Sequence, residues 1–326
     1  MQRAEQNGNA LFVERGVTSA PQIGQIDMKK VIPRRRMSAI FRMSIERVTR
    51  ELPGTFAVCA ERLDLDLDRD RDLDRDDAAR ARLAWNDERV FPAASVIKIA
   101  VALEVLCAIA EGSLQASEPL LLREEDKVAG SGVLGALEPG LRLPLADVLY
   151  LAMAISDNTA ANLLVDRVGV GAVNARLAAL GLTTTRLAGR IFREGGEASK
   201  TTAAELVTLL GRVHRSEGLP PRACAELVAL MERTQTASTV GRGLPDERFP
   251  AVAAASGHAS PPIALAYKTG SLEGVVAEAA IVRAPGATYA IALLSEGSGD
   301  LRPNHDNVGR VLLGELSRAV YATLTS

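Results

Sequence analysis

The run from Ser95 to Ala110, SVIKIAVALEVLCAIA, constrains the fold of this chain more than any other feature of its sequence. Its apolar residues recur at spacings of three and four, Pro92 stands just before it, and Gly112 closes it. This pattern predicts a buried or half-buried helix. The run is also the longest apolar stretch, and it is too short and too charged to cross a bilayer. We therefore expect no membrane span.

Ser95 and Lys98 stand three residues apart at the head of this run, so they share one face of the predicted helix. Burial lowers the pKa of a lysine and makes it a better proton acceptor. The pair could thus be a nucleophile and its base, although serine and lysine at this spacing are common in helices.

Charge and residue usage exclude several classes of function. A net charge of −2, a pI near 6.1 and 3% aromatic residues argue against nucleic acid as a partner. The three cysteines are widely spaced among apolar neighbours, which predicts free buried thiols. The three histidines form no metal-binding pattern. We expect neither a metal nor any other cofactor, and the expected partner is a small-molecule substrate.

Residues 1–36 form an N-terminal extension that mixes both charges and lacks the apolar core of a Sec signal peptide. We expect it to be disordered or a mis-assigned leader, with a basic surface-binding tail, KKVIPRRR, as the alternative. Met28, Met37 and Met43 are each possible starts. The expected location is cytoplasmic, or periplasmic or secreted if the start differs or export is non-standard.

An aspartate-rich run follows at 64–82, with eight aspartates. Its spacing is similar to a calcium loop, but the turn glycine and closing glutamate of an EF-hand are missing. The residues on either side, 54–63 and 82–91, have the composition of strands. We expect a hairpin with the acidic run as its solvated loop, and calcium binding remains the alternative.

Two further motifs lie downstream. Ser156-Asp157-Asn158 stands at the junction of two helical runs, where such residues also serve as simple helix caps. Lys268-Thr269-Gly270-Ser271 lies in a run rich in small and β-branched apolar residues, which predicts a strand with two more strands after it.

Taken together, SxxK, SDN and KTG in this order and in these elements resemble the signature of class A β-lactamases and penicillin-binding proteins. The resemblance covers 37–326 and implies an α/β (α+β) fold. Residues 37–93 and 261–326 would form an antiparallel sheet covered by helices, and residues 94–260 an all-helical domain. The reactive serine would lie at their seam.

The resemblance, combined with the chemistry of acyl transfer, implies a role for each motif residue. Ser95 would be the nucleophile, Lys98 its base and Ser156 the proton relay. Lys268 would hold a positive charge near Ser156 and attract a substrate carboxylate. Substrate binding would involve Asn158, Thr269, Gly270 and Ser271. The backbone N–H groups of Ser95 and Ser271 would stabilise the oxyanion.

One stretch departs from the family pattern. Class A enzymes carry a glutamate in the loop after the SDN helix, where it primes the water that releases the acyl group. If Arg190 is aligned with the family arginine, Phe192 stands at the glutamate position and Arg193 at that of the following proline. Glu194 or Glu197 could substitute as the deacylation base, but such a base must be placed closely.

The sequence therefore predicts a serine hydrolase that opens β-lactam amides through a Ser95 acyl-enzyme and deacylates slowly. An esterase or D-Ala-D-Ala peptidase, and a penicillin-binding sink or sensor that stays acylated, remain as alternatives.

Overall fold

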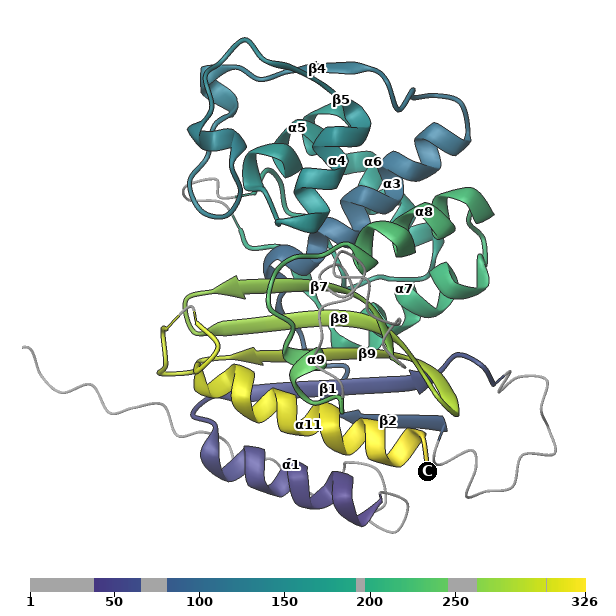
Figure 1. Ribbon diagram of the computed structural model, residues 1–326, viewed down its shortest axis with the longest axis vertical. Helices are drawn as coiled ribbons and strands as arrows, with labels where there is room; N and C mark the ends of the chain where they lie inside the picture. The colour runs from purple at the N-terminus through teal and green to yellow at the C-terminus, as the bar shows by residue number, and fades with distance from the viewer. Residues whose placement is uncertain (1–37, 66–80, 192–196, 246–262, 303) are drawn as a thin grey trace, which may run out of the picture. The chain divides into compact units, whose positions relative to one another are not determined.

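A five-stranded antiparallel sheet with the order β2-β1-β9-β8-β7 forms the central layer (Figure 1). The computed structural model describes residues 38–65, 81–191, 197–245, 263–302 and 304–326. The strands are β1 (Thr55–Arg62), β2 (Arg82–Trp85), β7 (Ala264–Leu272), β8 (Val275–Ala284) and β9 (Ala287–Glu296). The predicted antiparallel sheet is confirmed, and β7, with the Lys268–Ser271 motif, lies at its edge.

The hairpin predicted over 54–63 and 82–91 is present but shorter. Strand β2 pairs with β1 only as far as Trp85. Phe91–Pro92 instead forms β3, which pairs with β6 (Lys200–Thr201). The chain leaves the sheet after Trp85 because Asn86, with φ +51, begins a turn.

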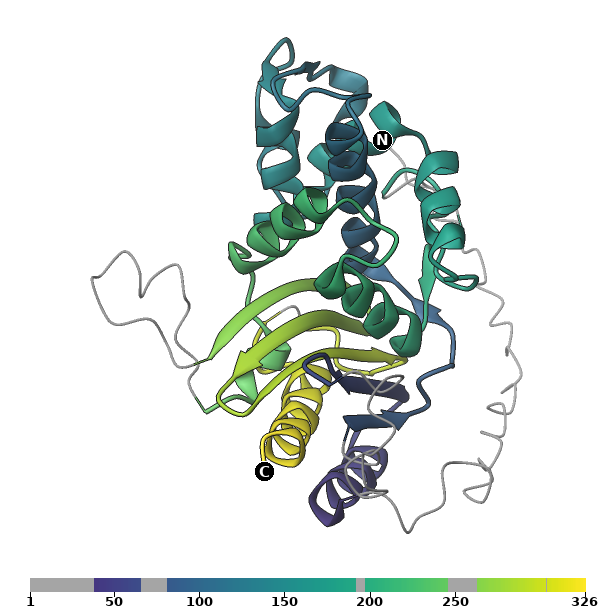
Figure 2. The ribbon, with the colours of Figure 1, turned by 90° about the vertical axis from the view of Figure 1, so that its right-hand side faces the viewer.

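Helices cover both faces of the sheet (Figures 1 and 2). On one face lie α11 (Val308–Leu324), which contacts β1, β8 and β9, and α1 (Ala39–Glu51), which packs on α11. On the other lie α7 (Ala203–Arg215) and α8 (Pro221–Glu232). Helix α1 buries Phe41, Ile45 and Val48, whose spacing of three and four makes one apolar stripe. The prediction that helices cover the sheet is confirmed.

The segment between β3 and β7 is mostly helical, and α3 (Lys98–Ala110) is at its centre. Every residue of α3 from Lys98 to Ala108 is buried, because α4, α5, α6 and α8 all contact this helix. Glu104 is accommodated there by an ion pair with Arg176, at 2.8 Å. The other helices of the segment are α4 (Leu145–Ala154), α5 (Asn158–Val168), α6 (Val170–Ala179) and the short α9 (Thr239–Arg242).

Short elements join these layers. They are the 3₁₀ helices η2 (Ala94–Ile97), η3 (Glu124–Asp126) and η4 (Leu134–Ala136), and the paired strands β4 (Pro119–Leu121) and β5 (Arg142–Pro144). Cys59, Cys107 and Cys224 are buried as free thiols. No helix within the described ranges combines the length and hydropathy needed to cross a membrane.

Several sequence-based predictions fall outside the described residues. These are the N-terminal extension, most of the aspartate-rich run, and Phe192, Arg193 and Glu194 of the loop after α6. Residues 35–326 cluster as one compact unit. The division into a sheet domain and an all-helical domain therefore stays a prediction.

Candidate active site

Ser95 lies in η2, the 3₁₀ turn that leads into α3, rather than on the α-helix itself. The preceding Ala94 has φ +45, a conformation that costs free energy for a residue with a side chain. Strand β7 approaches this turn closely at Gly270, where a Cβ would stand 2.7 Å from the Ser95 nitrogen. Only glycine fits there, so the turn and the strand edge are held in direct contact.

A cavity of about 490 Å³ opens between these elements. Of the residues predicted from the sequence, it is lined by Ser95, Ser156, Asn158, Thr269, Gly270 and Ser271. The remaining lining residues come from four other segments and are Gly130, Ser131, Thr236, Ala237, Asn304, His305 and Arg310. A hollow of this size with convergent polar groups suits a small molecule.

Lys98 is the first residue of α3 and is 1% exposed. Its Nζ donates to the Ser156 carbonyl oxygen at 2.6 Å, to Asn158 Oδ1 at 2.8 Å and to Ser156 Oγ at 3.2 Å. Burial lowers the pKa of Lys98 to about 7, and the nearby Asp157 only partly opposes this shift. A substantial share of Lys98 is therefore neutral near pH 7 and can accept a proton.

Lys268 reaches the same hydroxyl from the opposite side. Its Nζ donates to Ser156 Oγ at 2.9 Å and to the Thr269 carbonyl oxygen at 2.8 Å, and its side chain is fully buried. Burial, and then the charge of Lys98, hold the pKa of Lys268 well below its usual range. Ser156 Oγ thus bridges two lysines, only one of which can be charged without a large penalty.

The backbone around Ser156 is fixed by its neighbours. Ser156 has φ +58, and its carbonyl oxygen also accepts from Ser131 Oγ at 2.6 Å. Asp157 caps α5 through the Ala160 N–H at 2.8 Å. Its other carboxylate oxygen accepts the Val133 and Leu134 N–H groups at 2.6 and 2.8 Å. Asp157 therefore ties the 131–134 loop to the start of α5, in addition to capping the helix.

The Asn158 amide is hydrogen-bonded through both its oxygen and its nitrogen. Its Oδ1 accepts from Lys98, and its Nδ2 donates to the Ala129 carbonyl oxygen at 3.0 Å. The sequence predicted Asn158 as a substrate-binding residue. The residue lines the cavity, but its Oδ1 is bonded to Lys98 and its Nδ2 is already engaged by Ala129.

Sequence reasoning missed seven lining residues of this cavity, and three of them, Ser131, Thr236 and Arg310, form hydrogen bonds to the predicted site residues. Thr236 Oγ1 lies 2.7 Å from Thr269 Oγ1, and Arg310 of α11 donates to Ser271 Oγ at 2.6 Å. Within the described part of the chain, no carboxylate lies within ion-pair distance of Arg310, which lines the cavity. Burial lowers the pKa of Arg310, and the nearby Glu278 carboxyl opposes this shift. No local motif marks these residues, because each reaches the site from a distant segment.

Two expected relationships are not seen. Among hydrogen bonds of the described residues, none joins Ser95 Oγ to Lys98, although catalytic hydrogen bonds often form only when substrate binds. Glu197, one of the two candidate deacylation bases, is exposed and does not line the cavity. At the start of the loop that contains Glu197, the buried Asn162 fixes the backbone of Ile191. Asn162 Oδ1 accepts from the Ile191 N–H at 2.6 Å, and Asn162 Nδ2 donates to the Ile191 carbonyl oxygen at 3.1 Å.

No group of three or more His, Cys, Asp or Glu side chains lies in a metal-binding arrangement in the ranges that the structure describes. The polar groups that line the cavity are hydroxyls, amides, the His305 imidazole and the Arg310 guanidinium, which suit an anionic organic ligand.

Known proteins share this fold and much of this sequence pattern. The model of the beta-lactamase enzyme family matches residues 43–324. A beta-lactamase from Sphaerobacter thermophilus superposes with a TM-score of 0.73 at 27% identity, covering 87% of this chain and 96% of that one. PBP-A superposes with a TM-score of 0.71 at 27% identity, covering 88% and 96%. A variant of PBP-A was solved as an acyl-enzyme complex with penicillin G. It has the same TM-score and identity to this chain, and the match covers 87% of this chain and 95% of the variant. No curated protein sequence matches this chain.

Proposed function

The chain belongs to the beta-lactamase enzyme family, and from this premise we propose that it forms an acyl-enzyme on Ser95 with β-lactams or related carboxylate-bearing acyl donors. Ser95 Oγ attacks the carbonyl carbon while Lys98 Nζ takes the hydroxyl proton. The C–N bond of the tetrahedral intermediate then breaks. Ser156 Oγ gives its proton to the leaving nitrogen and is reprotonated from Lys98.

The observation that carries this proposal is the state of Lys98. A lysine that is 1% exposed, has no ion-pair partner in the described residues and has a pKa lowered to about 7 is costly to keep for structure alone. Its Nζ lies within hydrogen-bond distance of Ser156 Oγ, which gives the abstracted proton a route onward.

Oxyanion stabilisation falls to the backbone N–H groups of Ser95 and Ser271, which the contact at Gly270 brings near each other. The Thr269 and Ser271 hydroxyls and the Arg310 guanidinium bind the substrate carboxylate. Lys268 is buried, with its pKa lowered, and it contributes mainly through Ser156 Oγ. Arg310 is thus the principal cation offered to the ligand, a role that sequence reasoning gave to Lys268.

For the second step we propose slow release of the acyl group. Glu197 is exposed and away from the cavity, so no glutamate of the described part of this loop is positioned to activate water. Without such a base, water attack should lose about 10²- to 10⁴-fold in rate. The protein would then act as a poor β-lactamase or a penicillin-binding protein, and small esters or D-Ala-D-Ala-like peptides remain as alternative substrates.

The test is covalent labelling followed by a count of turnovers. Wild-type protein should be labelled by a fluorescent penicillin, and Ser95→Ala should lose the label while its circular dichroism stays unchanged. β-Lactam consumption should show a burst of about one equivalent and then slow turnover. Labelling that survives in Ser95→Ala would overturn the assignment, and rapid turnover without a burst would overturn slow deacylation.

A further inference from the structure

Ser131 reaches the surroundings of Lys98 from the loop before η4, and no step of the proposed acyl transfer uses it. Its hydroxyl donates to the Ser156 carbonyl oxygen at 2.6 Å and to Asn158 Oδ1 at 3.5 Å. The same two oxygens accept from Lys98 Nζ, at 2.6 and 2.8 Å. Ser131 and Lys98 therefore share both of these acceptors.

The 129–134 loop is held in place by bonds that do not involve the Ser131 hydroxyl. The Asn158 N–H donates to the Ser131 carbonyl oxygen at 2.9 Å, and Asn158 Nδ2 donates to the Ala129 carbonyl oxygen at 3.0 Å. The Asp157 carboxylate accepts two further backbone N–H groups of the loop, at 2.6 and 2.8 Å. The hydroxyl is thus not needed to fix the backbone of its own loop.

The shared oxygens influence which protonation state of Lys98 is stable. The ammonium form is stabilised by oxygens that accept its hydrogens. Two donors that point at one oxygen bring their hydrogens close together, and the repulsion between them is larger when one donor is charged. At the Ser156 carbonyl oxygen, the Ser131 hydroxyl therefore disfavours the ammonium form of Lys98 relative to the neutral amine.

Two charged groups face Lys98 from the elements around it. Asp157, at the cap of α5, opposes the effect of burial on the pKa of Lys98, and Lys268 of β7 donates to the same Ser156 Oγ. A substitution at Ser131 leaves both groups in the protein. We propose that Ser131 is a positioning residue that keeps Lys98 in its proton-accepting form by competing for the Ser156 carbonyl oxygen. This inference rests on the proposed acyl transfer.

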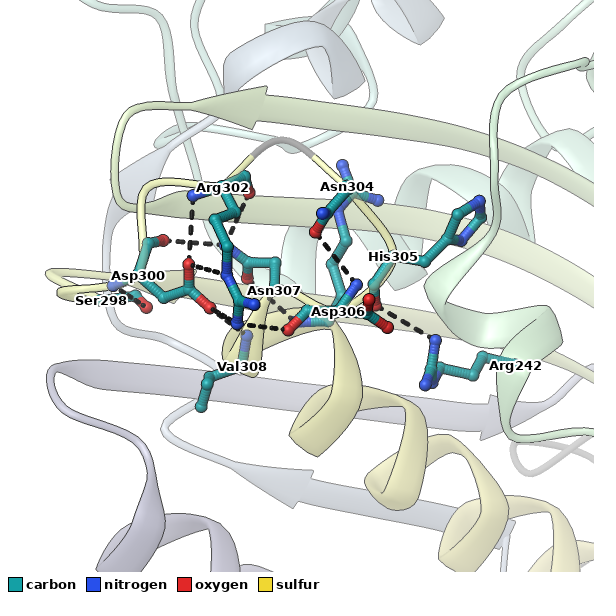
Figure 3. Close-up of polar contacts among 10 residues, drawn as sticks. Arg242, Ser298, Asp300, Arg302, Asn304, His305, Asp306, Asn307 and Val308 are labelled. Carbon is teal, nitrogen blue, oxygen red and sulfur yellow. Dashed lines mark hydrogen bonds and ion pairs between the residues drawn. The ribbon is translucent and has the colours of Figure 1, made fainter.

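The carboxylate-binding side of the cavity is braced separately, by bonds at the start of α11 (Figure 3). Asp300 accepts the Val308 N–H at 2.8 Å, and Asn307 Nδ2 donates to the Asp300 carbonyl oxygen at 2.8 Å. Asn307 Oδ1 accepts the Arg310 N–H at 3.3 Å, which fixes the backbone of the residue proposed to bind the carboxylate. Loss of the Ser131 hydroxyl should therefore leave carboxylate recognition unchanged.

The experiment follows acylation by one penicillin across pH in wild type, Ser131→Ala and Ser131→Thr. In Ser131→Ala the inflection that Lys98 imposes near pH 7 should move up by about 0.5 to 1 pH unit, which is the effect of one hydrogen bond. The rate should then fall about three- to tenfold at pH 6 and less than about twofold at pH 9. Ser131→Thr, which keeps the hydroxyl, should retain the wild-type profile.

Ser113→Ala is the matched control. The Ser113 hydroxyl also donates to a backbone carbonyl oxygen, that of Ala108 at 3.0 Å, but Ser113 does not line the cavity. The preference for the penicillin over its methyl ester, which lacks the carboxylate charge, should be the same in Ser131→Ala and wild type. A changed preference would overturn the inference, because it would show that the whole cavity had rearranged.

A second readout does not depend on acylation. In NMR of the unacylated protein with ε-¹³C-labelled lysine, the Lys98 signal, identified by its absence from Lys98→Ala, should titrate at higher pH in Ser131→Ala than in wild type. An unchanged titration, or the same change in Ser113→Ala, would overturn the inference and leave the acylation chemistry standing. Failure of a penicillin to acylate the wild type would instead overturn the proposed function, and with it the role of Ser131 in acylation.

Discussion

At the scale of single residues, the site depends on charges that are placed in low-dielectric surroundings. Lys98, Lys268 and Glu278 are all buried within one region of the molecule. Burial shifts the pKa of each group in the direction that favours its neutral form: it lowers the pKa of the two lysines and raises that of Glu278. The protonation state of the site should therefore change near neutral pH, where exposed lysines and glutamates do not titrate.

The first prediction concerns Lys98 as the base. Because its pKa is lowered to about 7, the acylation rate should rise about tenfold per pH unit below 7 and level off above it. Lys98→Ala should slow acylation by about 10²- to 10⁴-fold and remove this inflection. The measurement is stopped-flow acylation by a penicillin across pH. An unchanged inflection in Lys98→Ala would exclude Lys98 as its source, and exposed Lys200→Ala is the control.

The second prediction concerns Glu278 of β8, which is fully buried and opposite Thr269 on β7. Its carboxylate accepts from Ser238 Oγ at 2.5 Å and from the Thr239 N–H at 2.6 Å. Arg310 of α11 and Lys268 of β7 are the charged groups that face it. Burial raises its pKa to about 7, so the folded state binds this proton more tightly than the unfolded state.

The sign for stability follows from that difference. Between pH 4.5 and 7 the folded form keeps a proton that the unfolded form loses, so Glu278 lowers the free energy of unfolding as the pH rises, by up to about 3 kcal/mol. Glu278→Gln should flatten this dependence in urea titrations, whereas exposed Glu138→Gln should not. Identical pH profiles for Glu278→Gln and wild type would contradict the assignment.

At the scale of elements, the contact between strand β7 and turn η2 holds the nucleophile in place. We predict that Gly270→Ala displaces one of them, because its Cβ would lie 2.7 Å from the Ser95 nitrogen and 3.0 Å from that of Val96. Acylation should fall by about 10²-fold or more through misplacement, with about 1–3 kcal/mol of stability lost. The control is Gly171→Ala, since nothing lies within 4 Å of the added Cβ. Wild-type acylation by Gly270→Ala would show that the contact is dispensable.

The helices and strands that could be predicted from the sequence are those with a local signal. The helix after Ser95, the terminal helices and the edge strand were predictable because periodicity and composition are local signals. The 3₁₀ turn at Ala94–Ile97 was not, because the apolar spacing that predicts a helix continues through it. Ser131, Thr236 and Arg310 were also missed. They enter the site through contacts such as Thr236 with Thr269 and Arg310 with Ser271, which only the folded chain creates.

At the scale of the whole molecule, the sheet and the helical segment share their packing. Helices α7 and α8 contact the sheet, and α8 also contacts α3 at the centre of the helical segment. We predict that both unfold in one transition. Urea unfolding followed by fluorescence of Trp85, the single tryptophan, should coincide with loss of far-UV circular dichroism. Two separated transitions would instead show that the predicted sheet and helical domains are independent folding units.

The order of strands in the sheet has a consequence for biosynthesis. Thr55 of β1 pairs with Glu296 of β9, so a nascent chain must add about 240 residues after β1 before its partner exists. At roughly 5–20 residues per second, this delay is roughly 10 to 50 s. Throughout that interval the inner edge of β1 is unpaired, which makes it available for mispairing with other nascent chains. Expression of this protein should therefore be sensitive to chaperone supply during translation.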